Sequence, residues 1–384
     1  MATYRRMTTM IVAAALLGVF CGVALAVEVA PGVQVHGYML NRFYTASGTS
    51  AEFRMERVSI STIAALANDS KAYFEMYYQP GLSSLSSTAG SIYIESAYFD
   101  TPVGEGRLRI GKGRRVTFGI TPEWSKRRTT NYGIVSEAFT QSRIQGLQYS
   151  LQKDALDLGI SLHQGFRLGS RVLGEIAGDP RAVHEVKHLC FKEETGNLMG
   201  RKMEIAARLG GKWEGGLKAG VSYSTGRLED VDLANMTSIV AASTLNTAGG
   251  LGTSLVPTTA TNKKRNVWGL DFTYEHPSGF LAQGEYYDAS VSALDYKAWN
   301  ALLGYKNPQG WMFFARYSKQ DMPASRLSAN EFSWDNKQVS LSIVQPLRKG
   351  LWLQWEYEIN SEKPPVGIDT KKNNLFFVEL FTGF

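Results

Sequence analysis

A dense run of basic side chains lies in residues 107–143, RLRIGKGRRVTFGITPEWSKRRTTNYGIVSEAFTQSR. The run holds nine lysines or arginines and two glutamates. Guanidinium groups offer forked donors to phosphate and carboxylate oxygens. Around a narrow passage they would attract anions and repel cations. This stretch therefore predicts anion binding or anion passage.

The elements that position these side chains are predicted strands. In LWLQWEYEI at 351–359, apolar side chains alternate with Gln354, Glu356 and Glu358. Such a period of two is typical of strands with one apolar face. Sixteen segments show it, near 33–44, 52–65, 70–79, 91–100, 106–115, 143–152, 155–164, 202–210, 213–224, 265–275, 279–288, 296–305, 310–318, 335–345, 350–359 and 372–384.

The connections between these segments alternate between short and long. The short ones lie at 67–70, 101–106, 153–154, 210–212, 276–279, 306–310 and 346–350, and the long ones at 116–142, 165–201, 225–264, 319–334 and 360–371. Outer-membrane barrels join antiparallel strands by tight turns at one rim and long loops at the other. The predicted fold class is an all-β transmembrane antiparallel up-and-down barrel of about 16 strands, with short periplasmic turns and long extracellular loops. An extra hairpin in 225–264 would give eighteen strands, and a water-soluble β-sandwich would not explain the alternation.

The start of the sequence is typical of an exported protein. Arg5 and Arg6 precede an uncharged run that closes on Ala24-Leu25-Ala26. Residues 1–26 are therefore predicted to be a cleaved signal peptide, with an uncleaved membrane anchor as the alternative. Cleavage would remove these two arginines and reduce the net charge from +6 to +4. Residues 27–384 form the predicted barrel domain.

The other end, LFFVELFTGF, finishes on Phe384. A barrel must pair its last strand with its first, which suits a strand that ends flush at the rim. The run also resembles the C-terminal signature by which the barrel-assembly machinery recognises Gram-negative outer-membrane proteins. The predicted location is the outer membrane of a Gram-negative-type envelope.

Strand parity predicts which basic residues face the lumen. If Leu108 and Ile110 face lipid, Arg107 and Arg109 face inward, because lipid-facing arginine is costly. Loop 116–142 is the candidate constriction loop, long enough to bend into the barrel. The predicted pore-lining and constriction residues are Arg57, Arg107, Arg109, Arg115, Lys126, Arg127 and Arg128. The alternative for the last three is a basic loop at the outer rim that binds lipopolysaccharide phosphates.

The same parity gives the lumen both signs of charge. It places inside Arg57, Glu75, Glu95, Lys218, Glu285, Arg316, Glu356 and Glu379. Acidic and basic walls would create a transverse field, which limits any strict selectivity for anions.

Four segments resemble the phosphate-selective porin O and P family: FRMERVSIS (53–61), AYFEMYY (72–78), IESAYFD (94–100) and LRIGKGRRVTFGITP (108–122). That family has a motif that runs from a glycine to Pro-Phe-Gly. Gly111 and Phe118-Gly119 match it, but this chain has Thr117 in place of the proline. The resemblance implies a sixteen-stranded, usually trimeric porin whose constriction loop folds inward. Many proteins with this pattern are general porins, so phosphate specificity is not implied.

Patterns for catalysis or metal binding are weak. His163 has inward parity and lies near Ser161, which leaves an enzymatic barrel as a rival class. His184, His188 and Cys190 could ligate zinc if they lay on a helix, but no fourth ligand is evident. The sequence therefore predicts no enzyme activity, no cofactor and no metal.

The predicted function is an outer-membrane porin for passive diffusion of small hydrophilic solutes and ions, with a modest preference for anions that could extend to phosphate. The rival is a plugged structural, adhesive or enzymatic barrel. The predicted partners are membrane lipid and lipopolysaccharide, the solutes, the barrel-assembly machinery through Phe384, and two further copies in a homotrimer. No nucleic-acid partner is predicted.

Overall fold

The computed structural model describes residues 27–46, 51–79, 91–120, 128–130, 132–140, 143–172, 187–192, 202–230, 232, 262–292, 294–322, 334–363 and 374–383. Residues 1–26 and Phe384 lie outside these ranges, so the signal peptide and the terminal signature stay predictions. No helix among the described residues is long and apolar enough to span a membrane.

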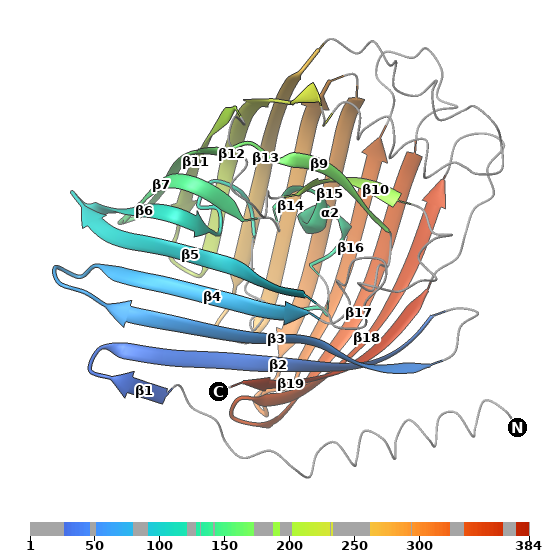
Figure 1. Ribbon diagram of the computed structural model, residues 1–384. Coiled ribbons are helices and arrows are strands. Elements are labelled where there is room, and N and C mark those ends of the chain that lie inside the picture. The colour runs from blue at the N-terminus through green and yellow to red at the C-terminus, as the bar shows by residue number, and fades with distance from the viewer. Residues whose placement is uncertain are drawn as a thin grey trace, which may run out of the picture.

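The chain forms a closed antiparallel β-barrel, which confirms the predicted fold class (Figure 1). Its sheet contains seventeen strands, of which β1 (Val27–Ala30) is a short addition that pairs with β2. The wall strands are β2 (Val33–Ala46), β3 (Glu52–Ala65), β4 (Lys71–Gln79), β5 (Ser91–Val103), β6 (Gly106–Gly113), β7 (Ile144–Lys153), β8 (Leu156–Gln164), β11 (Met203–Lys212), β12 (Leu217–Arg227), β13 (Lys264–Glu275), β14 (Phe280–Val291), β15 (Leu294–Lys306), β16 (Met312–Met322), β17 (Trp334–Arg348), β18 (Leu351–Lys363) and β19 (Leu375–Gly383). These sixteen match the sixteen predicted segments.

Two pairings close the wall. The last strand, β19, pairs with β2 from Leu375 opposite Ala46 to Gly383 opposite Tyr38. β8 pairs directly with β11, so the long connection between these two strands contributes no strand to the wall. That connection carries a separate hairpin, β9 (Arg167–Val172) and β10 (Lys187–Lys192). β12 pairs directly with β13, so no further wall strand lies between them and the alternative of eighteen strands is wrong.

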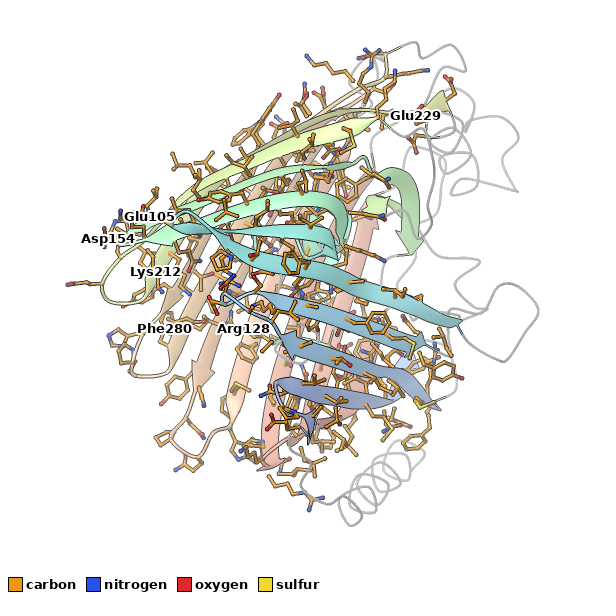
Figure 2. The ribbon with its side chains drawn as sticks, turned by 60° about the vertical axis from the view of Figure 1, so that its left-hand side comes forward. Glu105, Arg128, Asp154, Lys212, Glu229 and Phe280 are labelled. Carbon is orange, nitrogen blue, oxygen red and sulfur yellow. The ribbon has the colours of Figure 1, made fainter. Side chains whose placement is uncertain are left out.

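The two rims differ, as predicted. Glu105, Asp154, Lys212 and Phe280 lie near the short-turn rim in Figure 2, and Glu229 lies at the opposite end. Asp154 adopts a positive φ of 51°, which Asp tolerates better than most side chains.

Five of the seven predicted turns lie partly or wholly in strands, at 101–106, 153–154, 210–212, 306–310 and 346–350. β5 continues to Val103, which leaves Gly104 and Glu105 as the turn. The predicted turn at 210–212 belongs to β11, and its glycines serve close packing instead: a Cβ on Gly211 would lie 2.6 Å from the Trp213 ring. The turn follows at residues 213–216.

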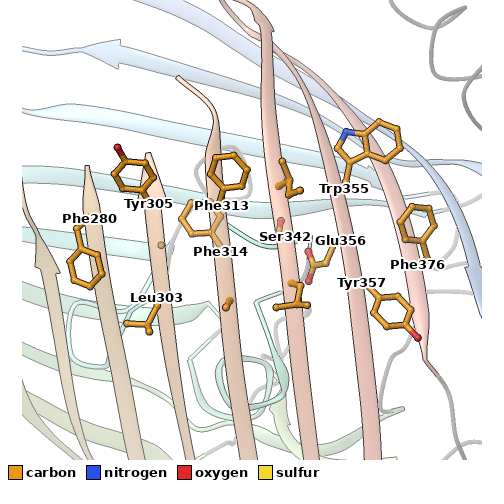
Figure 3. Close-up of a pocket in the computed structure, with 14 residues that line it drawn as sticks. Phe280, Leu303, Tyr305, Phe313, Phe314, Ser342, Trp355, Glu356, Tyr357 and Phe376 are labelled. Atoms are coloured by element: carbon orange, nitrogen blue, oxygen red, sulfur yellow. The ribbon is translucent and has the colours of Figure 1, made fainter. Parts of the chain in front are cut away.

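The outer face of the wall is apolar. On β16, Phe313 is 41% exposed and points outward, while Arg316 and Ser318 on the inner face are 3% and 0% exposed. Figure 3 shows Leu303, Tyr305 and Phe313 projecting from neighbouring strands around a shallow groove on this wall. Apolar outer faces with aromatic girdles are how barrels contact lipid.

Gly111 in β6 lies opposite Gly146 in β7 and has a φ of +124°. A Cβ at position 111 would lie 2.4 Å from the backbone carbonyl oxygen of Ala97. We expect Gly111→Ala to destabilise the barrel by about 2–4 kcal/mol, through backbone strain and the clash. The protein is refolded in detergent and incubated with increasing urea. The measurement is the urea concentration at which half of the folded, heat-modifiable band is lost in gel electrophoresis of unheated samples.

Gly104→Asn is the matched control. Gly104 also has a positive φ, of +60°, but a Cβ added there would meet no atom within 4 Å, and Asn accepts this conformation. Equal urea midpoints for Gly111→Ala, the control and the wild type would contradict the prediction.

Candidate functional site

The connection between β6 and β7, here called loop 3 (residues 114–143), enters the barrel. Its short helix α2 (Ile134–Phe139) lies inside the wall in Figure 1. Apolar side chains of α2 pack on the inner face of β13 to β15, against Val267, Tyr287, Ala289, Val291, Tyr296 and Ala298. The Phe139 and Tyr287 rings stack with centroids 4.9 Å apart. Loop 3 therefore packs through an apolar contact against one side of the lumen.

Glu285 on β14 is the central polar anchor of loop 3. Its carboxylate accepts hydrogen bonds from the Ile120 backbone N–H at 2.7 Å and from Ser136 Oγ at 3.1 Å. It also accepts from Asn300 Nδ2 and from the Tyr287 hydroxyl, both at 2.9 Å. The residue is 5% exposed, so four donors compensate the cost of burying it.

A second set of contacts holds the stretch before α2. The Thr130 N–H donates to Glu356, and Gln354 Nε2 donates to the Arg128 carbonyl oxygen at 3.2 Å. Arg316 donates to Thr129 Oγ1. β18 thus binds the backbone of the loop, and β16 binds one of its side chains.

Arg42 on β2 completes this anchoring. Its guanidinium pairs with Glu379 at 2.7 Å and donates to the Thr130 carbonyl oxygen at 3.3 Å. The residue is 2% exposed. It was not among the predicted site residues, although it shares an inner face with Tyr38 and Tyr44, so strand parity alone could have found it.

Two β-bulges add carboxylates to the inner wall. In β3, Leu40 pairs with Arg57 and Asn41 with Met55, so Glu56 is the extra residue. In β5 the extra residue is Glu95, by the same reasoning from its pairing with β4. A bulge re-aims side chains, which lets the neighbours Glu56 and Arg57 both point inward.

The structure places Arg107 and Arg109 on the inner face beside Asp100. Arg107 also pairs with Asp69 at 2.7 Å, which sets it at the short-turn rim rather than beside loop 3. Arg109 lies 3.1 Å from Asp100 Oδ2, with its guanidinium 4.1 Å from the centre of the Tyr98 ring.

The other predicted residues are held in different ways. Arg57 is buried and donates to Gln79 Oε1 at 3.1 Å. Arg115 is buried with its guanidinium 3.9 Å from the centre of the Phe166 ring. Lys126 and Arg127 lie outside the described residues, so their role stays a prediction.

Arg128 shows how deep loop 3 reaches. Its guanidinium pairs with Glu275, the last residue of β13, at 2.5 Å, and Figure 2 shows it near the short-turn end. Partial burial lowers the pKa of Arg128 and Glu275 opposes that shift; an arginine stays protonated at neutral pH.

The inward carboxylates on β3 to β6 are more buried than four arginines of β3, β6 and the start of loop 3, although Arg57 and Arg115 are buried as well. Four acidic residues here are only 3–7% exposed: Glu56, Glu75, Glu95 and Asp100. They face internal partners, such as Arg143 for Glu95 at 2.5 Å. In contrast, Arg54, Arg107, Arg109 and Arg114 are all partly exposed. Among the side chains described on this wall, water therefore meets guanidinium groups more than carboxylates.

The inner histidine does not form a catalytic arrangement. His163 Nδ1 lies 2.8 Å from the Gln164 carbonyl oxygen, and its Nε2 lies 3.9 Å from Glu204. Ser224 donates to Glu204 and not to the histidine. Activation of a serine needs a direct pairing with its base, which these contacts do not provide.

Zinc binding by His184, His188 and Cys190 would have required a helix, and the part of this segment that the structure describes is a strand. His188 and Cys190 lie in strand β10, and His184 lies outside the described residues. Among the described residues, no group of three or more His, Cys, Asp or Glu side chains could hold a metal ion.

No family model and no curated protein matches the chain. Solved structures match almost all of it at low identity. They include the outer membrane channel DcaP of Acinetobacter baumannii (12% identity, 94% of this chain and 100% of that chain, TM-score 0.60). The anion-selective porin from Comamonas acidovorans is 12% identical over 92% of this chain and 99% of that chain, with a TM-score of 0.55. OmpT of Vibrio cholerae in its trimer form is 13% identical over 92% of this chain and 99% of that chain, also with a TM-score of 0.55. The chain shares their barrel fold. The phosphate-selective family stays a resemblance.

Removal of the Glu285 carboxylate tests the anchoring of loop 3. We expect Glu285→Ala to leave four donors without their acceptor and to loosen the loop by about 2–4 kcal/mol. Single-channel recordings in a planar bilayer should then show larger conductance with frequent flicker. The control is Glu105→Ala, which removes an exposed turn carboxylate paired with Lys153. Identical traces for both variants would show that Glu285 does not position the loop.

Proposed function

We propose that the chain is an outer-membrane porin, a water-filled channel through which small hydrophilic solutes and ions diffuse passively, with a modest preference for anions. The exported, outer-membrane location belongs to the same proposal. A sixteen-stranded barrel supports it, because side chains alone fill barrels of about half that strand number. Loop 3 narrows such a lumen without any need for tight binding, which suits rapid diffusion.

The observation that carries the anion preference is the unequal exposure of charge. Glu285 and Glu356 accept hydrogen bonds from loop 3 and Glu379 pairs with Arg42, so these three carboxylates are turned away from open water. On the opposite wall, the carboxylates are buried and the arginines Arg109 and Arg114 keep solvent access. The net field at the passage then favours anions, including phosphate, although the buried acids keep the preference modest.

A plugged, non-conducting barrel is the second candidate. The observation in its favour is the β9–β10 hairpin, since β10 lies beside α2. If loop 3 and this hairpin together closed the lumen, the barrel would serve a structural, adhesive or enzymatic role instead. Measurement of conductance separates this candidate from the porin.

The reversal potential under a KCl gradient is the test of the proposed function. We expect the purified, refolded protein to conduct and to favour chloride. The variant Arg54→Ala/Arg109→Ala/Arg114→Ala should lower the chloride-to-potassium permeability ratio by about twofold or more, because each screened charge contributes under about 1 kcal/mol. Lys153→Ala at the turn rim is the control. Preference for potassium would refute the anion preference, and absence of conductance would refute the porin.

Assembly as a homotrimer is also part of the proposal, and one side of the outer wall supports it. The outward face of β2 to β5 carries Met39, Met55 and Met76 and has no tryptophan among its described residues. The outward face of β13 to β18 instead carries Trp268, Trp299 and Trp355. Methionine is enriched in protein interfaces, whereas tryptophan girdles mark contact with lipid.

A bulky substitution on each face tests this assignment. Met55→Trp/Ile94→Trp should shift the protein from trimer to monomer, because the rings would prevent close contact of β3 and β5 with another copy. Leu303→Trp/Ile343→Trp changes the proposed lipid face and should leave the trimer intact. The measurement is the mass by light scattering after size exclusion in mild detergent. A monomeric wild type would contradict the proposed trimer.

A further inference from the structure

Two tyrosines on the inner wall, Tyr73 of β4 and Tyr98 of β5, form an aromatic pair that is open to the lumen. They lie directly opposite each other in the strand register. Their rings stack with centroids 5.0 Å apart and an interplanar angle of 24°. Both point inward, because the adjacent Phe74 and Phe99 are exposed on the outer face and side chains alternate along a strand. Both tyrosines are partly exposed, so the pair presents aromatic surface to water in the lumen.

Packing of loop 3 does not account for this pair. The other inward tyrosines of β2 and β4, Tyr38 and Tyr77, are buried and pack with Tyr132 of loop 3. In the described part of the chain, none of the apolar clusters of buried side chains includes Tyr73 or Tyr98. An aromatic surface in a hollow that stays open to water is a typical contact for a ligand.

A row of charged residues lies beside the pair, one step nearer the short-turn rim. In this row Lys71 of β4 lies opposite Asp100, and Asp100 lies opposite Arg109 of β6. The guanidinium of Arg109 lies 4.1 Å from the centre of the Tyr98 ring. Its Nε and Nη2 donate to Asp100 Oδ2 at 3.3 and 3.1 Å, whereas its Nη1 has no hydrogen-bond partner among the described residues. Because the side chain is partly exposed, Nη1 can donate to a solute.

The charges around the pair leave one net positive charge. Toward the short-turn rim, three cations face two carboxylates: Lys71, Arg107 and Arg109 against Asp69 and Asp100. Toward loop 3, two arginines balance two buried glutamates: Arg114 and Arg143 against Glu75 and Glu95. Lys71 is partly exposed and takes part in none of the ion pairs of the described residues. A solute with a single negative charge would therefore neutralise the layer at the rim side.

We propose that the tyrosine pair and the two cations beside it bind small aromatic monocarboxylates, of which benzoate is the simplest, as they cross the lumen. The ring of the solute stacks on the tyrosines, and its carboxylate accepts hydrogen bonds from Arg109 Nη1 and Lys71 Nζ. Tyr73 and Lys71 lie two residues apart on one strand, a span of about 7 Å, which such a solute can bridge. Partial exposure keeps the binding weak enough for release. The inference rests on the proposed function as a porin with a preference for anions.

The test compares how three carboxylates block the chloride current of single wild-type channels in a planar bilayer at neutral pH. Benzoate has a charge and an aromatic ring, cyclohexanecarboxylate has a charge and a saturated ring, and acetate has the charge alone. We expect benzoate to reach half-block at a concentration about fivefold lower than either of the others, because only its ring stacks face to face on tyrosine. Equal half-block concentrations for benzoate and either of the other ions would overturn the inference.

Variants assign the effect to the tyrosine pair. Tyr73→Leu/Tyr98→Leu removes both rings and should bring the three half-block concentrations together. Tyr73→Phe/Tyr98→Phe keeps the rings and should keep the preference for benzoate. The matched control is Tyr305→Leu/Tyr357→Leu, which changes two exposed tyrosines of the outer face and should behave like the wild type. An undiminished preference for benzoate in Tyr73→Leu/Tyr98→Leu would also overturn the inference.

A binding measurement separates this inference from the proposed function. Saturation-transfer NMR detects benzoate on the refolded full-length barrel in detergent whether or not the channel conducts. We expect a signal from the wild type that Tyr73→Leu/Tyr98→Leu and Lys71→Gln/Arg109→Gln each reduce by about fivefold or more. A chloride-preferring channel without this signal would refute the site alone. A barrel that gives the signal but does not conduct would refute the porin and retain the site.

Discussion

The structure depends on one constraint: inside a hydrocarbon layer no water can satisfy the hydrogen-bonding groups of the backbone. An open sheet edge would leave a row of such groups unpaired, so the wall must close. The pairings of β19 with β2 and of β8 with β11 achieve this closure. Once the wall is closed, every second side chain must face lipid and every other one the interior. The alternation of apolar and polar residues, the apolar outer face and the polar lumen all follow from that geometry.

A closed wall of this size leaves a lumen that the wall itself cannot fill, and loop 3 narrows it. The loop needs partners for its own backbone groups, and the inner faces of β14 and β18 supply them. Glu285 and Glu356 accept from backbone N–H groups, and Gln354 donates to a backbone carbonyl oxygen. The two carboxylates therefore have a structural role as acceptors, and the Gln354 amide has one as a donor. Their burial turns these acids toward loop 3, whereas Arg54, Arg109 and Arg114 stay partly exposed.

The period of two in the sequence predicted all sixteen wall strands because the membrane enforces it on each strand separately. Local chemistry was less reliable: the glycines at 210–212 are typical of a turn, yet Gly211 pairs in β11, where a Cβ would meet the Trp213 ring. The site was harder still. Parity placed Arg107 and Arg109 inward but could not give their partner, Asp100, or the height of Arg107 at the rim. Parity also missed Glu56, which lies 3.9 Å from Arg42, because it is the extra residue of a bulge that no periodicity contains.

The choice between arginine and lysine follows the same division into two faces. Every buried cation in the described part of the chain is an arginine, as in Arg42, Arg265 and Arg316. A buried cation must satisfy several acceptors at fixed positions, and the planar guanidinium with five donors does this well. The outward face of β15 to β17 carries lysines instead, Lys297, Lys319 and Lys337. Two of them pair with single aspartates beside them, Asp288 and Asp321. A partly exposed ammonium needs one such partner, because water can solvate the rest of it, whereas a buried cation needs several acceptors from the wall.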